Sequence, residues 1–117
     1  MLIFELPGLP KTVNAIGRKH WRIVSAERKK WKLLVWHAVR NAVPDTPFKK
    51  ARLVLTRFSS VEPDFDGNVS SWKSVIDGLV MAKIIDDDKM SVIGMPDFRW
   101  EKVKRGEGKI RIEVYPC

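Results

Sequence analysis

Six aspartates are the residues of this chain whose type and spacing most directly suggest chemistry. They lie between Asp64 and Asp88, with two lysines and one asparagine, in 25 residues of an otherwise basic chain. Asp64 and Asp66 are spaced D-x-D, while Asp86, Asp87 and Asp88 are consecutive. Carboxylate oxygens are among the ligands that Mg²⁺ prefers in proteins. This stretch therefore predicts a divalent-cation site.

A metal ion held by these residues would be suited to cleaving a phosphodiester. It would polarise the phosphate, lower the pKa of an attacking water and stabilise the leaving oxygen. Asp64 and Asp66 can reach one ion if the backbone turns there, and Asp88 or Asp87 closes the site if the intervening helix folds back. Lys73 would then lie near the metal, either as a cation for the transition state or to orient the water.

Two other interpretations concern the aspartates alone. Asp86–Asp88 would be a solvated turn if the mutual repulsion of three like charges simply favours exposure. The letters D-x-D-x-N, beginning at Asp64, also match the start of an EF-hand loop. In that loop the sixth residue should be glycine and the twelfth glutamate, but Val69 and Val75 stand there, so the EF-hand interpretation fails.

A restriction-type nuclease arrangement also matches some of these letters. Such sites carry a PD followed later by (D/E)-x-K, and this chain has Pro63-Asp64 and Asp87-Asp88-Lys89. The two motifs usually lie on neighbouring strands, whereas here a helix of about four turns is expected between them. The match is short and therefore ranks below the first interpretation.

The distribution of charge favours a polyanionic partner. The chain carries 22 Lys and Arg against 14 Asp and Glu, which gives a net charge of +8. Residues 1–60 hold 13 basic and 3 acidic side chains, whereas residues 61–117 hold 9 and 11. A basic half suits a phosphate-binding surface, because each neutralised phosphate releases counterions. A soluble protein that is merely basic is the alternative.

Length and composition are those of one domain covering residues 1–117, with an apolar fraction of 44% for its core. No apolar run approaches the ~20 residues of a membrane span, so we expect no membrane partner. The N-terminal residues lack the basic region and cleavage site of a signal peptide. The single cysteine, Cys117, excludes an intrachain disulfide, and we expect a cytoplasmic protein.

The elements that must position the aspartates are predicted from periodicity and turn residues. Strands are expected over 1–6, 51–58, 90–103 (irregular at 94–96) and 110–115, and helices over 26–42 and 69–82. Ser25 is the expected N-cap of the first helix, and Asn68 or Ser70 that of the second. A basic loop is expected over 11–23 and a hairpin turn over 104–109. The βαβαββ order predicts an α+β fold, with a mixed sheet packed against two helices.

Each expected helix has one apolar stripe that should face the core. The stripe of the first helix consists of Trp31, Leu34, Val35, Ala38, Val39 and Ala42. That of the second consists of Val69, Trp72, Val75, Ile76, Leu79 and Val80. Lys73 and Asp77, at positions i and i+4 of the second helix, must share a face.

Three blocks of this sequence together resemble the RusA family of Holliday-junction resolvases, endonucleases common in prophages. Leu6-Pro7 through Asn14 is similar to the family's N-terminal P-x-x-x-N segment, and residues 24–27 are similar to the start of its first helix. The most specific block matches the D-x-D-N…K…D-A-L…D-D signature. It consists of Asp64-Phe65-Asp66, Asn68, Lys73, Asp77-Gly78-Leu79 and Asp87-Asp88. Three extra residues lie between Asp66 and Lys73, and the D-A-L block is D-G-L here.

The resemblance implies four catalytic and three supporting residues. The catalytic residues would be Asp64, Asp66, Lys73 and Asp88, of which the three aspartates would bind the metal. The supporting residues would be Asp77, Asp87 and Asn68, with Asp77 expected to pair with Lys73. The cofactor would be Mg²⁺, for which Mn²⁺ would substitute.

The resemblance also implies a homodimer that resolves four-way junctions or other branched DNA during recombination and repair. A two-fold dimer presents two identical sites to the two strands that must be cut. The residues expected to hold DNA phosphates are Asn14, Arg18, Lys19, His20, Lys29 and Lys30. A non-catalytic branched-DNA-binding protein with the same fold, or a nuclease that acts on flaps or forks, are the alternatives.

Overall fold

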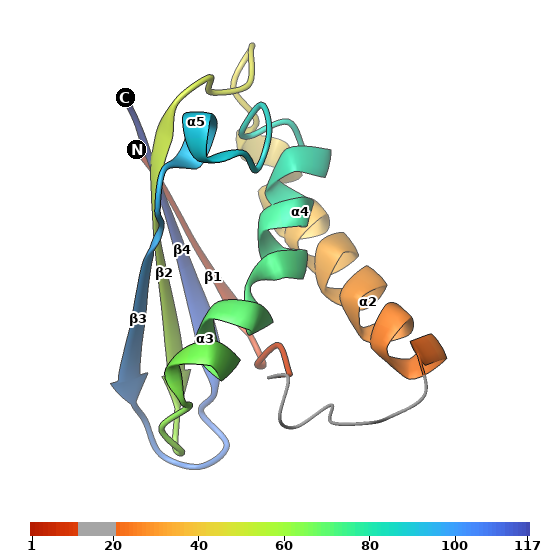
Figure 1. Ribbon diagram of the computed structural model, residues 1–117, viewed down its shortest axis with the longest axis vertical. Helices are drawn as coiled ribbons and strands as arrows, with labels where there is room; N and C mark the ends of the chain where they lie inside the picture. Colours follow the sequence, from red (N-terminus) through yellow and green to blue (C-terminus); the bar gives the residue numbers. More distant parts are fainter. Residues whose placement is uncertain (12–20) are drawn as a thin grey trace.

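A four-stranded mixed sheet forms one layer of the protein and helices form the other (Figure 1). The computed structural model describes residues 1–11 and 21–117, with the side chains of 1–11 and 25–117. The strands are β1 (Leu2–Pro7), β2 (Ala51–Ser59), β3 (Asp97–Lys102) and β4 (Lys109–Pro116). Their order is β1-β4-β2-β3: β4 is antiparallel to β1 and β2, and β3 is parallel to β2.

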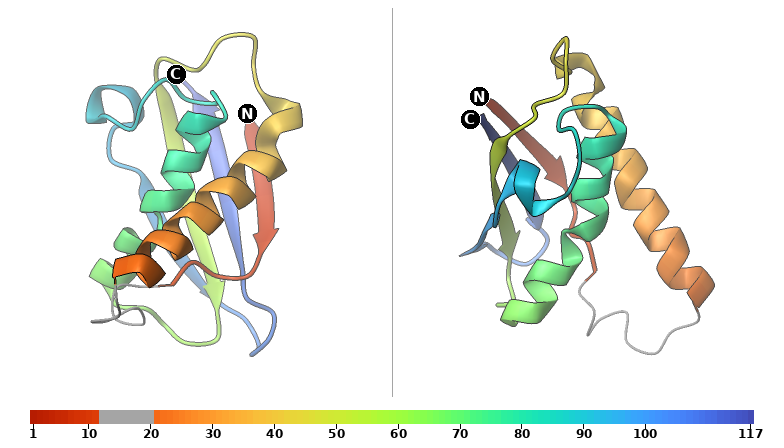
Figure 2. Two further views of the ribbon diagram at one scale, coloured as in Figure 1. Left: turned by 90° about the vertical axis from the view of Figure 1, so that its right-hand side faces the viewer. Right: turned by 45° about the horizontal axis from the view of Figure 1, so that its top comes forward.

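Two helices, α2 (Trp21–Val39) and α4 (Lys73–Met81), pack side by side on the same face of the sheet (Figure 2). The 3₁₀ turn η1 (Arg40–Ala42) follows α2, α3 (Phe65–Ser71) precedes α4, and the one-turn helix α5 (Met90–Ile93) leads into β3. None of the helices in the described residues is long and apolar enough to cross a membrane. The predicted α+β class with a mixed sheet is confirmed, but the structure contains more helices than the predicted order βαβαββ.

The core lies between the helices and the inner face of the sheet. Alternate residues of the two central strands are fully buried there, namely Leu53 and Leu55 of β2 and Ile110, Ile112 and Val114 of β4. They meet helical residues that are also buried, namely Trp31, Val35, Val39, Trp72, Val75 and Leu79. The period-two pattern of the last strand is therefore confirmed, because its apolar side chains all point to the helices.

The outer face of β2, which points away from the helices, is buried as well. Val54, Thr56 and Phe58 are each at most 5% exposed. Two long side chains of β4 lie over Phe58, and the charged ends of Lys109 and Arg111 are each 5.0 Å from the centre of its ring. Their aliphatic stems exclude water while the charges stay in solvent.

α2 begins at Trp21, about one turn earlier than predicted. Ser25 therefore lies inside the helix, and its prediction as the N-cap is wrong. No glycine or proline occurs between Trp21 and Pro44, so nothing in that stretch interrupts helical hydrogen bonding. Of the basic loop predicted over 11–23, residues 12–20 lie outside the described residues and 21–23 are helical.

α2 and α4 approach each other closely at Gly78. A Cβ atom at this position would lie 2.7 Å from Cβ of Val35 and 2.9 Å from the carbonyl oxygen of Lys32. The backbones of the two helices can come so near because the α4 residue at this contact is a glycine, which has no side chain. The apolar stripe predicted for the first helix is wider than its buried face, since Leu34, Ala38 and Ala42 are exposed.

The helix predicted over 69–82 is two helices in the structure. α3 begins earlier because Asp64 serves as its N-cap, with Gly67 N donating to Oδ1 of Asp64 at 2.7 Å. Asn68 and Ser70, the predicted caps, lie inside α3, so that prediction is wrong. Trp72 separates α3 from α4, and the helical axis bends there (Figure 1).

The segment after the aspartates departs furthest from the prediction. Residues 90–93 form α5 rather than a strand, and Gly94, with φ of 60°, ends it. Periodicity alone does not separate a helical turn from a strand in so short an apolar run. The turn at 104–109 is not a hairpin either, since β2 lies between β3 and β4 in the sheet. The segment that connects β3 to β4 instead passes the end of β2.

Candidate functional site

Lys73 joins the start of α4 to the loop that follows that helix. Its Nζ donates to Oδ1 of Asp77 at 2.8 Å and to Oδ2 of Asp88 at 2.6 Å. Asp77 lies one turn further along α4, whereas Asp88 arrives from beyond the end of the helix. The expected pairing of Lys73 with Asp77 is therefore present, and Asp88 joins it in one cluster, which we call the Lys73 cluster.

The loop that carries Asp88 is anchored just before that residue, at positions 84–86. Phe48 N donates to the carbonyl oxygen of Ile84, and Asp86 N donates to that of Phe48, both at 3.0 Å. Ile84 and Ile85 are buried in the core, at 0% and 1% exposure. The loop after α4 is thus held by backbone hydrogen bonds and by apolar burial, which fixes the position from which Asp88 reaches back to Lys73.

The contacts in the Lys73 cluster favour the charged forms of Lys73 and Asp88. Hydrogen bonds to Asp77 and then to Asp88 raise the pKa of Lys73 above its ordinary value. The hydrogen bond from Lys73 is the largest cause that lowers the pKa of Asp88. The side chains of Lys73, Asp77 and Asp88 are 57%, 36% and 36% exposed, so water screens these pairs and their contribution to stability is small. Their arrangement is better suited to holding charge in place than to stabilising the fold.

Asp64 and Asp66 lie at the N-terminal end of α3, on either side of the exposed Phe65. Asp64 caps the helix through Oδ1, and Asp66 occupies the first turn, where a carboxylate interacts favourably with the helix dipole. About two helical turns separate Asp66 from Lys73. α3 and the bend at Trp72 take up this length, including the three residues by which the spacing exceeds the RusA pattern.

The three predicted metal ligands do not form one cluster in the structure. Within residues 1–11 and 21–117, no group of three Asp, Glu, His or Cys side chains is placed to hold a metal ion. Their chemistry still fits Mg²⁺, because carboxylate oxygens are ligands that this ion prefers, and water and phosphate can supply its other ligands. Of the Asp88 oxygens, Oδ2 is the one that accepts the hydrogen bond from Lys73.

The other predicted supporting residues have structural contacts. Asn68 is buried, and its Oδ1 accepts a hydrogen bond from Nε1 of Trp72 at 3.1 Å. This hydrogen bond therefore stabilises the bend between α3 and α4, and the side chain of Asn68 is buried rather than exposed to solvent. Oδ1 of Asp87 accepts from the backbone N of Asp88 at 2.7 Å, which orients the loop. Asp86 is exposed.

A cationic pocket of about 280 Å³ lies between α2 and the junction of α3 with α4. Its polar lining consists of Lys11, Glu27, Arg28, Ser70, Ser71, Lys73 and Ser74. The three cations outnumber the one carboxylate of this lining, and Ser74 adds a hydroxyl. The hydroxyls of Ser70 and Ser71 instead donate to backbone carbonyl oxygens. An excess of cations around one opening suits a phosphate site, since cations donate to phosphate oxygens. Lys73 belongs to this pocket and to the Lys73 cluster, so an anion bound in the pocket would lie beside Asp77 and Asp88.

Lys11 and Arg28 are candidate DNA contacts that were not predicted. Arg28 precedes the buried Trp31 by three residues, so it borders the inner side of α2, and that spacing was a usable signal in the sequence. Lys29 and Lys30 are exposed but do not line the pocket. Asn14, Arg18, Lys19 and His20 lie outside the described residues.

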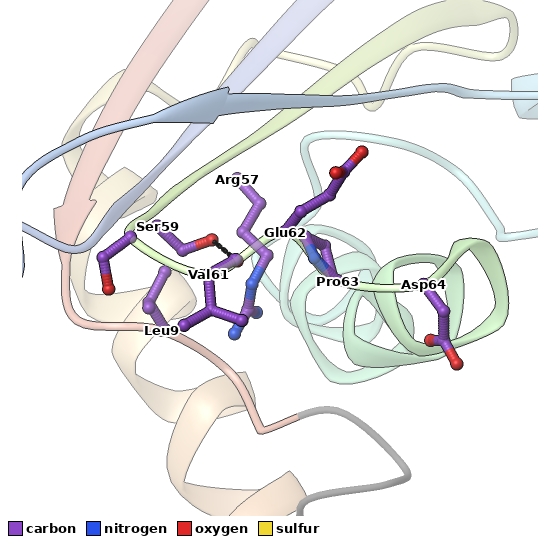
Figure 3. A pocket seen from close by; sticks show the side chains of 8 residues that line it. Leu9, Arg57, Ser59, Val61, Glu62, Pro63 and Asp64 are labelled. Carbon is purple, nitrogen blue, oxygen red and sulfur yellow. Dashed lines mark hydrogen bonds between the residues drawn. The ribbon is translucent and has the colours of Figure 1, made fainter.

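A second pocket, of about 400 Å³, opens at the end of β2 next to Asp64 (Figure 3). Its lining consists of Leu9, Arg57, Ser59, Ser60, Val61, Glu62, Pro63 and Asp64. We call it the Arg57 pocket. Asp64 therefore has the Arg57 pocket on one side and α3 on the other.

Comparison of the chain with models of known protein families, and with curated proteins, gives no match. What the fold defines is a small α+β protein with a four-stranded mixed sheet. A function for it must therefore be argued from the Lys73 cluster, the aspartates of α3 and the two pockets beside them.

Proposed function

We propose that the protein is a Mg²⁺-dependent, structure-selective endodeoxyribonuclease of the RusA type, which resolves Holliday junctions or related branched DNA by paired nicks. The observation that carries this proposal is the Lys73 cluster. In it, Lys73, which lines the cationic pocket, donates hydrogen bonds to the carboxylates of Asp77 and Asp88. A phosphodiester bound in that pocket would have both a cation and a carboxylate within reach.

Each residue of the site has a proposed role. Asp64, Asp66 and Asp88 would hold the metal through carboxylate oxygens, with DNA phosphate and water completing its ligands. When bound, Mg²⁺ supplies the Lewis acid that activates water and neutralises the phosphate. Lys73 stays protonated and stabilises the negative charge that develops in the transition state. Asp77 is a positioning residue, because it holds the ammonium of Lys73.

The DNA would be held mainly through its backbone. Lys11, Arg28 and Lys73 supply cations around one pocket, and the exposed Lys29 and Lys30 extend the basic surface along α2. Contacts of this kind are independent of base sequence and weaken steeply with salt. They therefore suit recognition of a branched shape better than recognition of a base sequence.

A homodimer is part of the proposal, because two strands must be cut symmetrically. The side of α2 that faces away from the core carries apolar residues that suit a contact between subunits. Leu33 is 47% exposed and Trp36 37%, with the guanidinium of Arg40 5.6 Å from the centre of the Trp36 ring. Light scattering on the purified protein should give a dimer mass, and Leu33→Asp should shift it toward the monomer.

The central test compares cleavage of labelled four-way junction, fork, flap and linear duplex with Mg²⁺, Mn²⁺ or Ca²⁺. We expect paired nicks in the junction with Mg²⁺ and Mn²⁺, and binding without cleavage with Ca²⁺. Asp66→Asn should bind the junction and leave it intact. Cleavage by Asp66→Asn at the wild-type rate would refute the mechanism, and preferential cleavage of forks or flaps would change the substrate.

A non-catalytic branched-DNA-binding protein is the second candidate. It is favoured by the fact that Asp64, Asp66 and Asp88 do not form a single cluster among the described residues. Such a protein would bind the junction equally well with EDTA or Mg²⁺ and would produce no nicks with any metal. The same set of reactions therefore separates it from the nuclease.

A further inference from the structure

Arg57 is a buried cation that forms no ion pair among the described residues. It lies on β2, on the side that faces the helices, and only 8% of it is exposed. Within the described residues, its Nη1 donates to the carbonyl oxygen of Pro10 at 2.7 Å, and its buried Nε has no hydrogen-bond partner. Burying a charge without a counter-ion costs free energy, so an arginine at this position requires an explanation.

The contact with Pro10 does not explain the charge. A neutral donor could bond the same carbonyl oxygen, whereas the guanidinium also brings a buried Nε–H that nothing in the described residues accepts. Burial also lowers the pKa of Arg57, which is the mark of a cation that its surroundings do not compensate. A bound anion would provide the negative charge that balances the guanidinium of Arg57.

Arg57 points into a pocket that has room for such an anion. Figure 3 shows its guanidinium within the Arg57 pocket, whose volume is about 400 Å³, while the carboxylates of Glu62 and Asp64 are directed away from it. Ser59 is already engaged, since its Oγ donates to the carbonyl oxygen of Val61 and accepts from Trp100 Nε1. The exposed hydroxyl of Ser60 is the other donor in the lining.

We propose that the Arg57 pocket binds a phosphate group of the DNA strand, next to the phosphate that is cleaved, with Arg57 as its charge partner and Ser60 as a second donor. That the phosphate belongs to DNA rests on the proposed function. The anion site itself rests only on the buried guanidinium and its pocket.

The position of the pocket gives this proposal its geometry. Leu9 lines the Arg57 pocket, while the next two residues, Pro10 and Lys11, line the cationic pocket at Lys73. α3 leads from Asp64, in the first pocket, to Ser70 and the following residues in the second. A strand with phosphates in both pockets would therefore pass the carboxylates of Asp64 and Asp66, and the Arg57 pocket would fix its register there.

The first experiment measures the anion site without DNA. In ¹⁵N-edited NMR spectra, the Nε–H signal of Arg57 should move saturably when inorganic phosphate is added. The signal of Arg52, which lies on the same strand but pairs with Asp97 in solvent, should not. An Arg57 signal that is indifferent to phosphate overturns the proposal.

The second experiment uses the junction, in Ca²⁺ to prevent cleavage. Arg57→Gln keeps a donor for Pro10 but removes the charge, so the slope of log affinity against log salt should fall by about one phosphate contact. Arg52→Gln should leave the slope unchanged. Methylphosphonates placed singly around the cleavage site should weaken wild-type binding at one position, and Arg57→Gln should be insensitive at that same position.

Outcomes for the pocket and for the nuclease are distinguishable. If phosphate moves the Arg57 signal but no metal supports cleavage, the anion site stands and the nuclease proposal fails. If the junction is cut but Arg57→Gln has the wild-type salt slope and methylphosphonate profile, the nuclease stands and this inference fails. Arg57→Gln removes an uncompensated buried charge and keeps a donor for Pro10, so it should unfold at no lower temperature than wild type, and loss of folding does not mimic either result.

Discussion

Nζ of Lys73 lies 2.6 Å from Oδ2 of Asp88, fifteen residues further along the chain. The contact is possible because the loop after α4 is held against Phe48 and returns toward the start of the helix. It links the lysine that would stabilise a cleaved phosphate to a carboxylate that would bind the metal. The following predictions test the roles of the residues around this contact.

Replacing Lys73 should remove catalysis and spare the fold. We expect Lys73→Met to lower the single-turnover rate of junction cleavage by about 10²- to 10³-fold, the usual cost of losing a group that stabilises transition-state charge. Its free energy of unfolding should change by less than about 1 kcal/mol, since the ion pairs of Lys73 are exposed. Asp77→Asn should give a smaller loss of rate with unchanged junction affinity. A Lys73→Met protein that cuts at the wild-type rate would contradict the role proposed here.

Two substitutions separate the structural and chemical roles of Asp64. Asp64→Asn retains an oxygen for Gly67 N, so α3 should stay capped while the carboxylate charge is lost. We expect nearly unchanged urea unfolding and no detectable cleavage. Asp64→Ala should lose both, with about 1 kcal/mol of stability removed by loss of the cap. If Asp64→Asn remains active, the Asp64 carboxylate has no catalytic role.

The hydrogen bond between Asn68 and Trp72 predicts a structural role for Asn68. Asn68→Ala leaves the buried Nε1 of Trp72 without its acceptor, which should cost about 1–3 kcal/mol in chemical denaturation. The penalty should be smaller when Trp72 is replaced by Phe, because the orphaned donor is then absent. Equal penalties in the two backgrounds would show that this hydrogen bond does not explain Asn68.

Gly78 should resist substitution because α2 and α4 touch there. Gly78→Ala places a methyl group 2.7 Å from Cβ of Val35 and should destabilise the protein by about 1–3 kcal/mol through overpacking. Lys83 gives a contrast of opposite sign just beyond the same helix, since its φ is 63° and glycine is favoured in that conformation. Thermal unfolding should show Lys83→Gly at or above wild type and Gly78→Ala well below it.

The pH dependence of stability follows from the Lys73–Asp88 pair. The folded state lowers the pKa of Asp88, so its contribution is complete above the unfolded pKa of about 3.9 and disappears as the pH falls through the folded value. The folded state raises the pKa of Lys73, whose contribution is complete below about pH 10.4 and disappears as the pH rises further.

The measurement for this pair is the difference in unfolding free energy between wild type and Asp88→Asn at several pH values. It should be less than about 1 kcal/mol because of solvent screening, constant from about pH 5 to 9, and smaller at pH 3. A difference that grows toward acid would mean that Asp88 is destabilising when ionised, contrary to its contact with Lys73.

The sequence by itself determined the parts of this protein that depend on local pattern. Alternation along residues 110–115 identified a strand with one buried face, and spacing of four residues identified the Lys73–Asp77 pair. Both are properties of strand and helix geometry that hold wherever the element lies in the fold. The same patterns gave the α+β class.

Tertiary structure decided everything that depends on two distant segments meeting. The start of α3 at Asp64 was missed for a local reason, since a capping hydrogen bond from Gly67, three residues further on, outweighed the apolar period on which the prediction depended. The predicted hairpin at 104–109 was wrong because the order of strands in a sheet depends on how whole strands pack, and β4 pairs with β1 and β2. The contact of Lys73 with Asp88, and the burial of Arg57 beside Pro10, likewise arise from loops that only the assembled core holds in place.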